Sequence, residues 1–209
     1  MSQLQEYLRF LVTLTAVLDP FLAVPIFLTV TASYGVQARV VLVRVVAITV
    51  FIVLAAAALL GDTILTLVGA SLSAFRVGGG LVLLLMALSM LNAEVGGVRQ
   101  SDAEAKELER GDVSPVVPLA VPLLAGPGAI SSTVIAAQAG GAAHIAALIG
   151  CILAVCGLLW LVLSVAPAIG ERMGITGLNV ATRLFGLLLA AIAIQTMAEG
   201  LRVLFPGLS

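Results

Sequence analysis

The chain has 209 residues, of which 61% are hydrophobic and only 10% are charged, and its net charge is −1. A soluble domain carries about 25% charged residues, so this composition cannot cover a water-facing surface and indicates an integral membrane protein. Without a basic field, nucleic acid is excluded as a partner. The opening segment carries Glu6 and Arg9 before its apolar run and does not resemble a cleaved signal peptide.

Six apolar stretches have the length that a membrane-spanning helix needs, about 20 residues. They cover approximately residues 7–31, 39–60, 67–91, 115–138, 143–167 and 178–204. Short breaks separate them at SYGVQAR, Gly61-Asp62, Gly140-Gly141 and GERMGITG. The sequence therefore predicts an all-α integral membrane fold with six transmembrane helices, in one transmembrane domain that covers residues 1–209.

Residues 92–114 form the one long polar segment, with six of the eleven acidic residues and three of the ten basic residues. We interpret it as a solvated connector with a candidate surface helix at DAEAKELER. On its side of the membrane, the sequence places Arg39, Arg44, Arg99, Lys106, Arg110 and Arg172. The side of the two termini holds Arg9 and Arg202. Because Lys and Arg accumulate in cytoplasmic loops, we expect a cytoplasmic connector and both termini outside.

The chain matches itself at an offset of 107 residues. The matched pairs are Pro20 with Pro127, Ala74 with Ala181, Arg76 with Arg183, Gly79 with Gly186, and Met90 with Met197. Arg and Pro are rare inside spans, so their shared offset indicates a repeat, with residues 1–91 as the first copy and 115–209 as the second. Three spans is an odd number, which predicts two inverted-topology three-helix repeats, as in many secondary transporters.

Prolines interrupt the first and fourth spans near their middles, at Asp19-Pro20 and at Gly126-Pro127. Proline removes an amide donor and clashes with the preceding turn, so helices one and four are predicted to be broken near the bilayer centre. Asp19 and Gly126 are suited to be N-caps, each with proline at the first helical position. Two half-helix N-termini would then present amide donors at the midplane.

A candidate substrate site surrounds these breaks, because a zwitterion needs donors for its carboxylate and an acceptor for its ammonium. The helix start at Gly128, with the hydroxyls that follow it, supplies donors, and Asp19 or the Leu18 carbonyl supplies an acceptor. The candidate residues are Asp19, Pro20, Gly126, Pro127, Gly128, Ala129, Ser131 and Ser132. An intramembrane carboxylate usually marks a site or pathway, although Asp19 could also be a structural N-cap without substrate contact.

Other polar residues in the spans allow more than one interpretation. Arg76 and Arg183 start helices, where they could snorkel to the interface or clamp a broken span as a gate. We expect His144 and Glu199 to lie at the interface. The two cysteines are expected to be core residues, and no metal or catalytic site is predicted, because a single histidine and a single midplane aspartate do not supply the residues of a membrane protease.

Three blocks of the sequence, LDPFLAVPIFLT, FRVGGGLVLLLMALSML and VPLAVPLLAGPGAISSTVI, resemble the MarC family of bacterial inner-membrane proteins. The resemblance extends over essentially the whole chain. It implies a multi-pass protein of the bacterial inner (plasma) membrane, with a fold related to amino acid exporters of the lysine-exporter type. It also implies, for some members, transport of small neutral amino acids.

These observations predict a secondary transporter of small neutral amino acids, similar to glycine or alanine, with membrane lipid and a small solute as its partners. The sequence shows no ATP-binding motif, so we expect coupling to an H⁺ or Na⁺ gradient and no cofactor. The alternatives are a transporter or channel for another small solute and a non-transporting membrane assembly partner. No pattern in the sequence indicates an oligomeric state.

Overall fold

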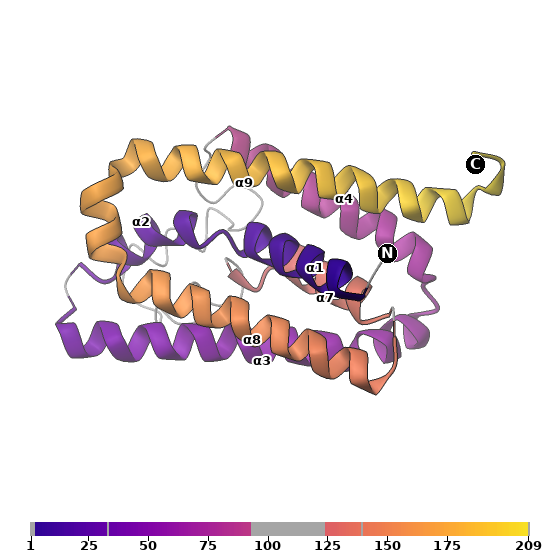
Figure 1. Ribbon diagram of the computed structural model, residues 1–209, viewed down its shortest axis with the longest axis horizontal. Helices are drawn as coiled ribbons and strands as arrows, with labels where there is room; N and C mark the ends of the chain where they lie inside the picture. The colour runs from indigo at the N-terminus through magenta and orange to yellow at the C-terminus, as the bar shows by residue number, and fades with distance from the viewer. Residues whose placement is uncertain (1–2, 33, 93–123, 139, 209) are drawn as a thin grey trace.

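The computed structural model describes residues 3–32, 34–92, 124–138 and 140–208, and every regular element in these ranges is a helix. The helices are α1 (Gln3–Leu18), α2 (Pro20–Val30), α3 (Val36–Val68), α4 (Leu72–Leu91), α7 (Pro127–Ala137), α8 (Ala142–Ser164), α9 (Ala166–Leu204) and the 3-10 helix η2 (Pro206–Leu208) (Figure 1). The predicted all-α class is therefore confirmed. Nearly all of the predicted connector, with its candidate surface helix, and the first part of the fourth span lie outside the described residues.

Five helices are long and apolar enough to cross a bilayer, when α1 and α2 are taken together as Gln3–Val30. α7 is shorter and corresponds to the second half of the predicted fourth span. Large apolar side chains point outward, among them Leu67, Ile175 and Leu187, which are 85%, 78% and 62% exposed. An outer surface of this kind suits contact with lipid.

The connection between the second and third spans lies later in the chain than predicted. α3 continues through Gly61 and Asp62 and ends at Val68, after which Gly69 adopts φ = 73°. A Cβ atom on Gly61 would lie 2.6 Å from Cγ2 of Val134, so this glycine lets α7 approach α3 closely. The predicted break at Gly61-Asp62 is wrong because a glycine inside a helix costs only about 1 kcal/mol, which does not end a long apolar helix that packs well.

The predicted break at GERMGITG takes the form of a sharp bend within α9. Gly174 has φ = 61° and ψ = 179°, a backbone conformation that only glycine adopts without strain. The short arm before the bend packs against α2, because a Cβ atom on Gly170 would lie 2.9 Å from Cδ1 of Leu28. The long arm after the bend runs beside α4 (Figure 1).

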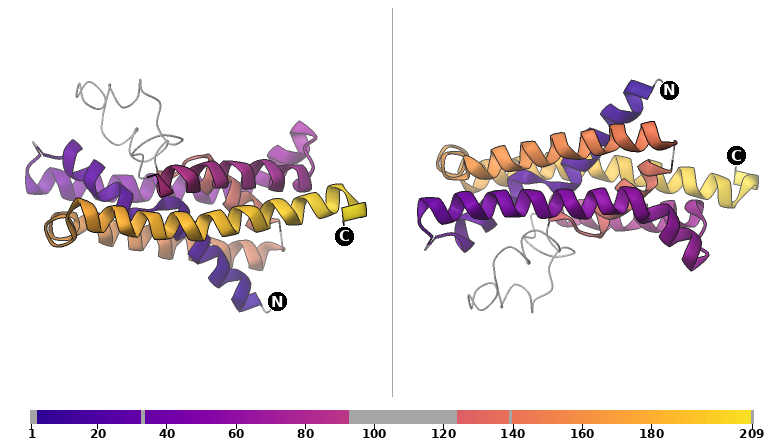
Figure 2. Two further views of the ribbon diagram at one scale, coloured as in Figure 1. Left: turned by 90° about the horizontal axis from the view of Figure 1, so that it is seen from above. Right: turned by 90° about the horizontal axis from the view of Figure 1, so that it is seen from below.

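The interrupted helices lie in the middle of the bundle. α4 and α9 form one pair, α3 and α8 form another, and α1, α2 and α7 lie between the pairs (Figures 1 and 2). In an apolar stretch of 18 consecutive residues within Gln3–Val30, 61% of the residues are buried, against 28–33% in the corresponding stretches of the other four long helices. The two chain ends lie toward the same end of the bundle (Figure 2).

α4 and α9 run antiparallel and touch through glycines. A Cβ atom on Gly186 would lie 2.9 Å from Cβ of Met90, and one on Gly200 would lie 2.7 Å from the backbone oxygen of Ser73. Small residues at such positions let two backbones approach, which strengthens van der Waals packing where the hydrophobic effect between helices is weak. Close contact along this pair therefore depends on the absence of these side chains.

Replacement of Gly200 by alanine is expected to destabilise the fold by about 1–3 kcal/mol, because the added methyl group overlaps backbone that cannot rotate away. The matched control is Gly150→Ala on α8, where a Cβ atom meets nothing within 4 Å. The control should be neutral or slightly stabilising, since alanine is the better helix former. Thermal unfolding of both purified proteins in detergent measures the difference, and equal midpoints would contradict this account of the α4–α9 contact.

Candidate functional site

The first span is interrupted at Asp19, as predicted. α1 ends at Leu18 and α2 begins at Pro20, and between them Asp19 has φ = 40° and ψ = 75°. Aspartate tolerates this left-handed conformation better than most residues, and Asp19 is the one non-glycine residue with positive φ in the described ranges. Its Oδ1 accepts a hydrogen bond from the Leu22 amide at 3.2 Å, which caps the new helix.

The capping role of Asp19 is therefore present, while its contact with a solute stays a prediction. The residue is completely buried, and Pro20 is buried beside it. Leu18 and Ala23, on the two sides of the break, both belong to the main hydrophobic core. The free backbone groups of the interruption thus face protein and not lipid, as they must in a membrane.

α7 also begins at a proline. Gly126 is the extended N-cap, with φ = −69° and ψ = 179°, and Pro127 occupies the first turn. Gly126, Gly128 and Ala129 are buried, whereas Pro127 is exposed. Leu124 and Ala129 belong to the same core as the break at Asp19, so both helix starts lie inside one packed region.

Side chains of α4 cover the first turn of α7. A Cβ atom on Gly128 would overlap Sδ of Met86 and would lie 3.2 Å from Cδ2 of Leu83. One turn further, Ser131 packs against Gly79, where a Cβ atom would lie 3.1 Å from that of the serine. In this conformation, the helix start that was predicted to receive a carboxylate is closed by Leu83 and Met86.

The hydroxyl groups of α7 are already engaged with its own backbone. The Ser132 and Thr133 hydroxyls both donate to the Ala129 carbonyl, at 3.0 Å and 2.8 Å. Ser132 was expected to donate to a carboxylate, but here its hydrogen is in use and only its lone pairs are available. Its oxygen can therefore accept a hydrogen bond from a cationic solute group.

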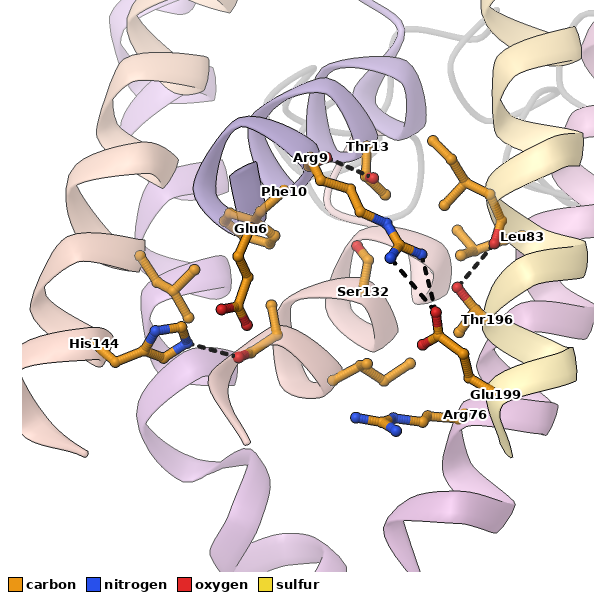
Figure 3. A pocket seen from close by; sticks show the side chains of 14 residues that line it. Glu6, Arg9, Phe10, Thr13, Arg76, Leu83, Ser132, His144, Thr196 and Glu199 are labelled. Atoms are coloured by element: carbon orange, nitrogen blue, oxygen red, sulfur yellow. Dashed lines mark hydrogen bonds and ion pairs between the residues drawn. The ribbon is translucent and has the colours of Figure 1, made fainter. Parts of the chain in front are cut away.

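A cavity of about 430 Å³ opens beside these residues, at the end of the bundle where the chain termini lie (Figure 3). Side chains from five helices line it: Glu6, Arg9, Phe10 and Thr13 of α1, Arg76 and Leu83 of α4, Ser132, Ile135 and Ala136 of α7, His144 and Leu148 of α8, and Ile192, Thr196 and Glu199 of α9. Of the predicted substrate residues, Ser132 alone lines the cavity. Asp19, Pro20, Gly126, Pro127, Gly128, Ala129 and Ser131 lie outside its lining.

Two acidic and two basic side chains face this cavity, an arrangement that the sequence reasoning missed. Glu6, Arg9, Arg76 and Glu199 carry charges that sum to zero. Of these residues, Glu199 was expected at the interface, and Glu6 and Arg9 were noted only as charges before the first apolar run. Arg9 and Glu199 are 190 positions apart in the chain, and only the packing of α1 against α9 shows that they face one cavity.

One of these cations already has a partner. Arg9 and Glu199 form an ion pair with 3.5 Å between Nη2 and Oε1, and Gln195 donates to the same oxygen at 3.2 Å. The two charged side chains are 31% and 40% exposed, so the pair contributes at most about 1 kcal/mol. Its role is geometric, because it ties α1 to α9 across the cavity (Figure 3).

His144 connects three helices at the cavity wall. Its Nε2 lies 3.0 Å from the Ala136 carbonyl oxygen, which can only accept, so Nε2 carries the hydrogen. In the neutral ring, Nδ1 then accepts the hydrogen bond from the Tyr7 hydroxyl at 3.1 Å. The histidine therefore fixes the turn between α7 and α8 against α1.

The two arginines matched by the internal repeat occupy different environments. Arg76 is half-buried in the cavity wall, and its Nε atom is buried without a hydrogen-bond partner among the described residues. Arg183 is exposed on α9 and does not line the cavity. The structure thus separates two residues for which the sequence suggested the same role.

Beyond the break at Asp19, α2 packs against α9 through an aromatic contact. Phe21 of α2 stacks on Phe185 of α9, with ring centroids 5.8 Å apart. Position 21 corresponds to Gly128 at the repeat offset of 107 residues, so the start of α2 has an aromatic ring where the start of α7 has no side chain. A hollow of about 350 Å³ lies nearby between α2 and the bend of α9, and it includes Pro25 and Gly174.

A family model and individual relatives all match this chain to the same family of membrane proteins. The pattern of the MarC family of integral membrane proteins matches residues 4–205. The chain is 36% identical to the UPF0056 membrane protein YhcE of Escherichia coli (strain K12), over 97% of this chain and 94% of the relative. It is 38% identical to the UPF0056 membrane protein YvbG of Bacillus subtilis (strain 168), over 95% of each chain.

An archaeal relative, a UPF0056 membrane protein of Methanocaldococcus jannaschii, is 37% identical over 95% of this chain and 97% of its own. No solved structure matches the chain significantly. The family match at residues 4–205 includes the residues around Asp19, the start of α7 and the cavity lining of this chain. A multi-pass integral membrane protein is the class that the relatives and the apolar helices support together.

Removal of the Asp19 cap by Asp19→Ala should lower stability by about 1–2 kcal/mol, because alanine neither accepts from the Leu22 amide nor tolerates φ = 40°. Asp19→Asn keeps both properties and should retain stability close to that of the wild type. Thermal unfolding in detergent compares the two variants. If Asp19→Ala were as stable as Asp19→Asn, the side-chain cap at position 19 would make no measurable contribution to stability.

Proposed function

This chain belongs to the MarC family of integral membrane proteins, and we propose that it is a secondary transporter of small neutral amino acids such as glycine or alanine. The observation that carries the proposal is the charged cavity, which enters the bundle from one end and reaches the second turn of α7 at Ser132. Ionisable residues inside a membrane protein are costly and usually mark a solute pathway. Four of them surround one space here.

The cavity fits the chemistry of a zwitterion. Two acids and two arginines balance each other, so a solute with one positive and one negative group meets a partner for each. A single net charge in the wall would instead favour an ion of the opposite sign. The volume of about 430 Å³ lies at the lower end of the range of small-molecule sites, about 300–1,000 Å³, as a small solute requires.

The interrupted helices provide the deeper part of the proposed pathway. The amides of Gly128 and Ala129, at the start of α7, suit a carboxylate, and Asp19 or the Leu18 carbonyl suits an ammonium. These groups lie in the core, beyond Leu83 and Met86. A solute in the cavity would reach them only after those two side chains move, so we assign this conformation to a state that precedes full entry.

We propose that two inverted repeats perform the movement. Inverted copies must cross the membrane in opposite directions, and the matched helices α4 and α9 do run antiparallel. Their contacts are also similar, since Gly186 faces Met90, while Gly80, one residue after the match of Gly186, faces Met197. The matched half-helices α2 and α7 each have 11 residues and each begin at a proline. Rocking of one repeat against the other would open the two ends in turn.

The distribution of basic residues sets the proposed orientation. α3 begins at the end of the bundle opposite to the termini (Figure 1), and Arg39 lies in its first turn. Arg39 donates from Nε to the Thr31 carbonyl at 3.1 Å and so caps the end of α2. With this end in the cytoplasm of a bacterial inner membrane, the termini and the charged cavity face outside, and an H⁺ or Na⁺ gradient would drive transport.

The proposal predicts uptake of labelled glycine or alanine into proteoliposomes that contain the purified chain, with an imposed H⁺ or Na⁺ gradient. Gly128→Leu should reduce the initial rate about tenfold or more, because the new side chain would occupy the helix start that Leu83 and Met86 already crowd. Gly150→Leu, on an open surface of α8, is the matched control and should retain the rate.

Both variants are compared at equal amounts of reconstituted, folded protein. A wild-type protein that moved no amino acid from a broad panel under either gradient would rule out the proposed function. Transport of another small solute by the same preparation would favour the alternative substrate class.

A further inference from the structure

We infer that Arg76 binds the carboxylate group of the solute in the cavity, before the solute reaches the start of α7. The inference rests on the proposed function, and it names the side chain that recognises one end of the transported zwitterion. The sequence suggested only that this arginine snorkels or clamps a helix. Three observations on the cavity wall lead to the assignment.

The first observation is the missing partner of Arg76. In the described part of the chain, Arg9 is paired with Glu199, whereas no ion pair within 4.0 Å joins Arg76 to an acid. Its Nε atom is also buried without a hydrogen-bond acceptor. A buried donor without a partner loses its hydration and gains nothing in return, so the site is incomplete without an acceptor.

The second observation is the direction of the side chain. Arg76 extends from α4 into the space between the helices, and Glu199 lies above it (Figure 3). α9 supports the base of the arginine, since a Cβ atom on Gly200 would lie 3.1 Å from Cβ of Arg76. The planar guanidinium presents parallel N–H groups, which a carboxylate can accept in pairs, so both solute oxygens can be bound at once.

The third observation is the distance to the deeper site. Arg76 and Leu83 both line the cavity from α4, and Leu83 covers Gly128 at the start of α7. Seven residues of helix advance by about 10 Å, which is longer than a glycine or alanine molecule. A carboxylate at Arg76 is therefore held at an outer position and must be released before it can reach the amides of α7.

The internal repeat provides the control residue. Arg183 matches Arg76 in sequence but is exposed outside the cavity, so its removal changes the same amount of charge without changing the cavity wall. Glu6 and Ser132 lie in the same wall and offer acceptors for the ammonium end. The assignment of Arg76 is thus specific to the carboxylate end.

The test measures ligand binding by the full chain in lipid nanodiscs, with three probes: glycine, glycinamide, which lacks the carboxylate, and acetate, which lacks the ammonium. Isothermal titration of the wild type should show binding of glycine and weaker binding of glycinamide. Arg76→Gln should weaken the binding of glycine and of acetate by about tenfold to a hundredfold, the value of a hydrogen bond to a charged group. The binding of glycinamide should not change in this variant.

Arg76→Lys keeps the charge but loses the paired N–H groups, so it should fall between the wild type and Arg76→Gln. Arg183→Gln should bind all three probes as the wild type does. Equal binding of glycine by Arg76→Gln and the wild type would overturn the inference and leave the proposed transport intact. If Arg76→Gln did not fold, Arg76→Lys and the wild-type comparison of glycine with glycinamide would decide the question.

Other outcomes would refute the proposed transport alone or the assignment of Arg76 alone. If the wild type bound acetate through Arg76 but bound no amino acid, the carboxylate site would stand and the proposed amino acid transport would fail. If the wild type bound glycine and glycinamide equally, or bound none of the probes, the assignment of Arg76 would be wrong.

Discussion

A backbone group that leaves its helix inside a lipid bilayer must find a partner within the protein, and this constraint organises the bundle. The first span breaks at Asp19, and α7 begins at Pro127, so the backbone groups left unpaired at both positions need protein around them. Both positions accordingly lie in the buried core, between the α4–α9 pair and the α3–α8 pair. The continuous helices are on the outside, where their apolar side chains can meet lipid.

The placement of the breaks also decides where polar chemistry can occur. The space beside α1 and α7 is lined at one end by charged side chains from α1, α4 and α9. α4 connects the two regions, because its face carries Arg76 at the cavity and Leu83 at the start of α7. The cavity and the start of α7 are thus separated by the apolar side chains of Leu83 and Met86.

The local elements could be predicted from the sequence, and the site could not. Asp-Pro specified the break and the cap at Asp19, and apolar length specified the helices, because both depend on neighbours in the chain. The break predicted at Gly61 failed because the glycine serves a contact with Val134, which is distant in sequence. The same limitation concealed the cavity, where Arg9 of α1 meets Glu199 of α9. Arg76 and Arg183 had equal sequence signals, and only packing distinguishes them.

The aromatic stack between Phe21 and Phe185 makes the two halves of the molecule energetically unequal. The position that corresponds to Phe21 in the second half is Gly128, which has no ring, so the start of α7 makes no equivalent stack. An aromatic pair of this kind contributes about 0.5–1.5 kcal/mol, which corresponds to a population ratio of roughly 2 to 12. In the proposed alternation between two conformations, a movement that parts α2 from α9 would lose this contribution, whereas the start of α7 would move without an equivalent loss.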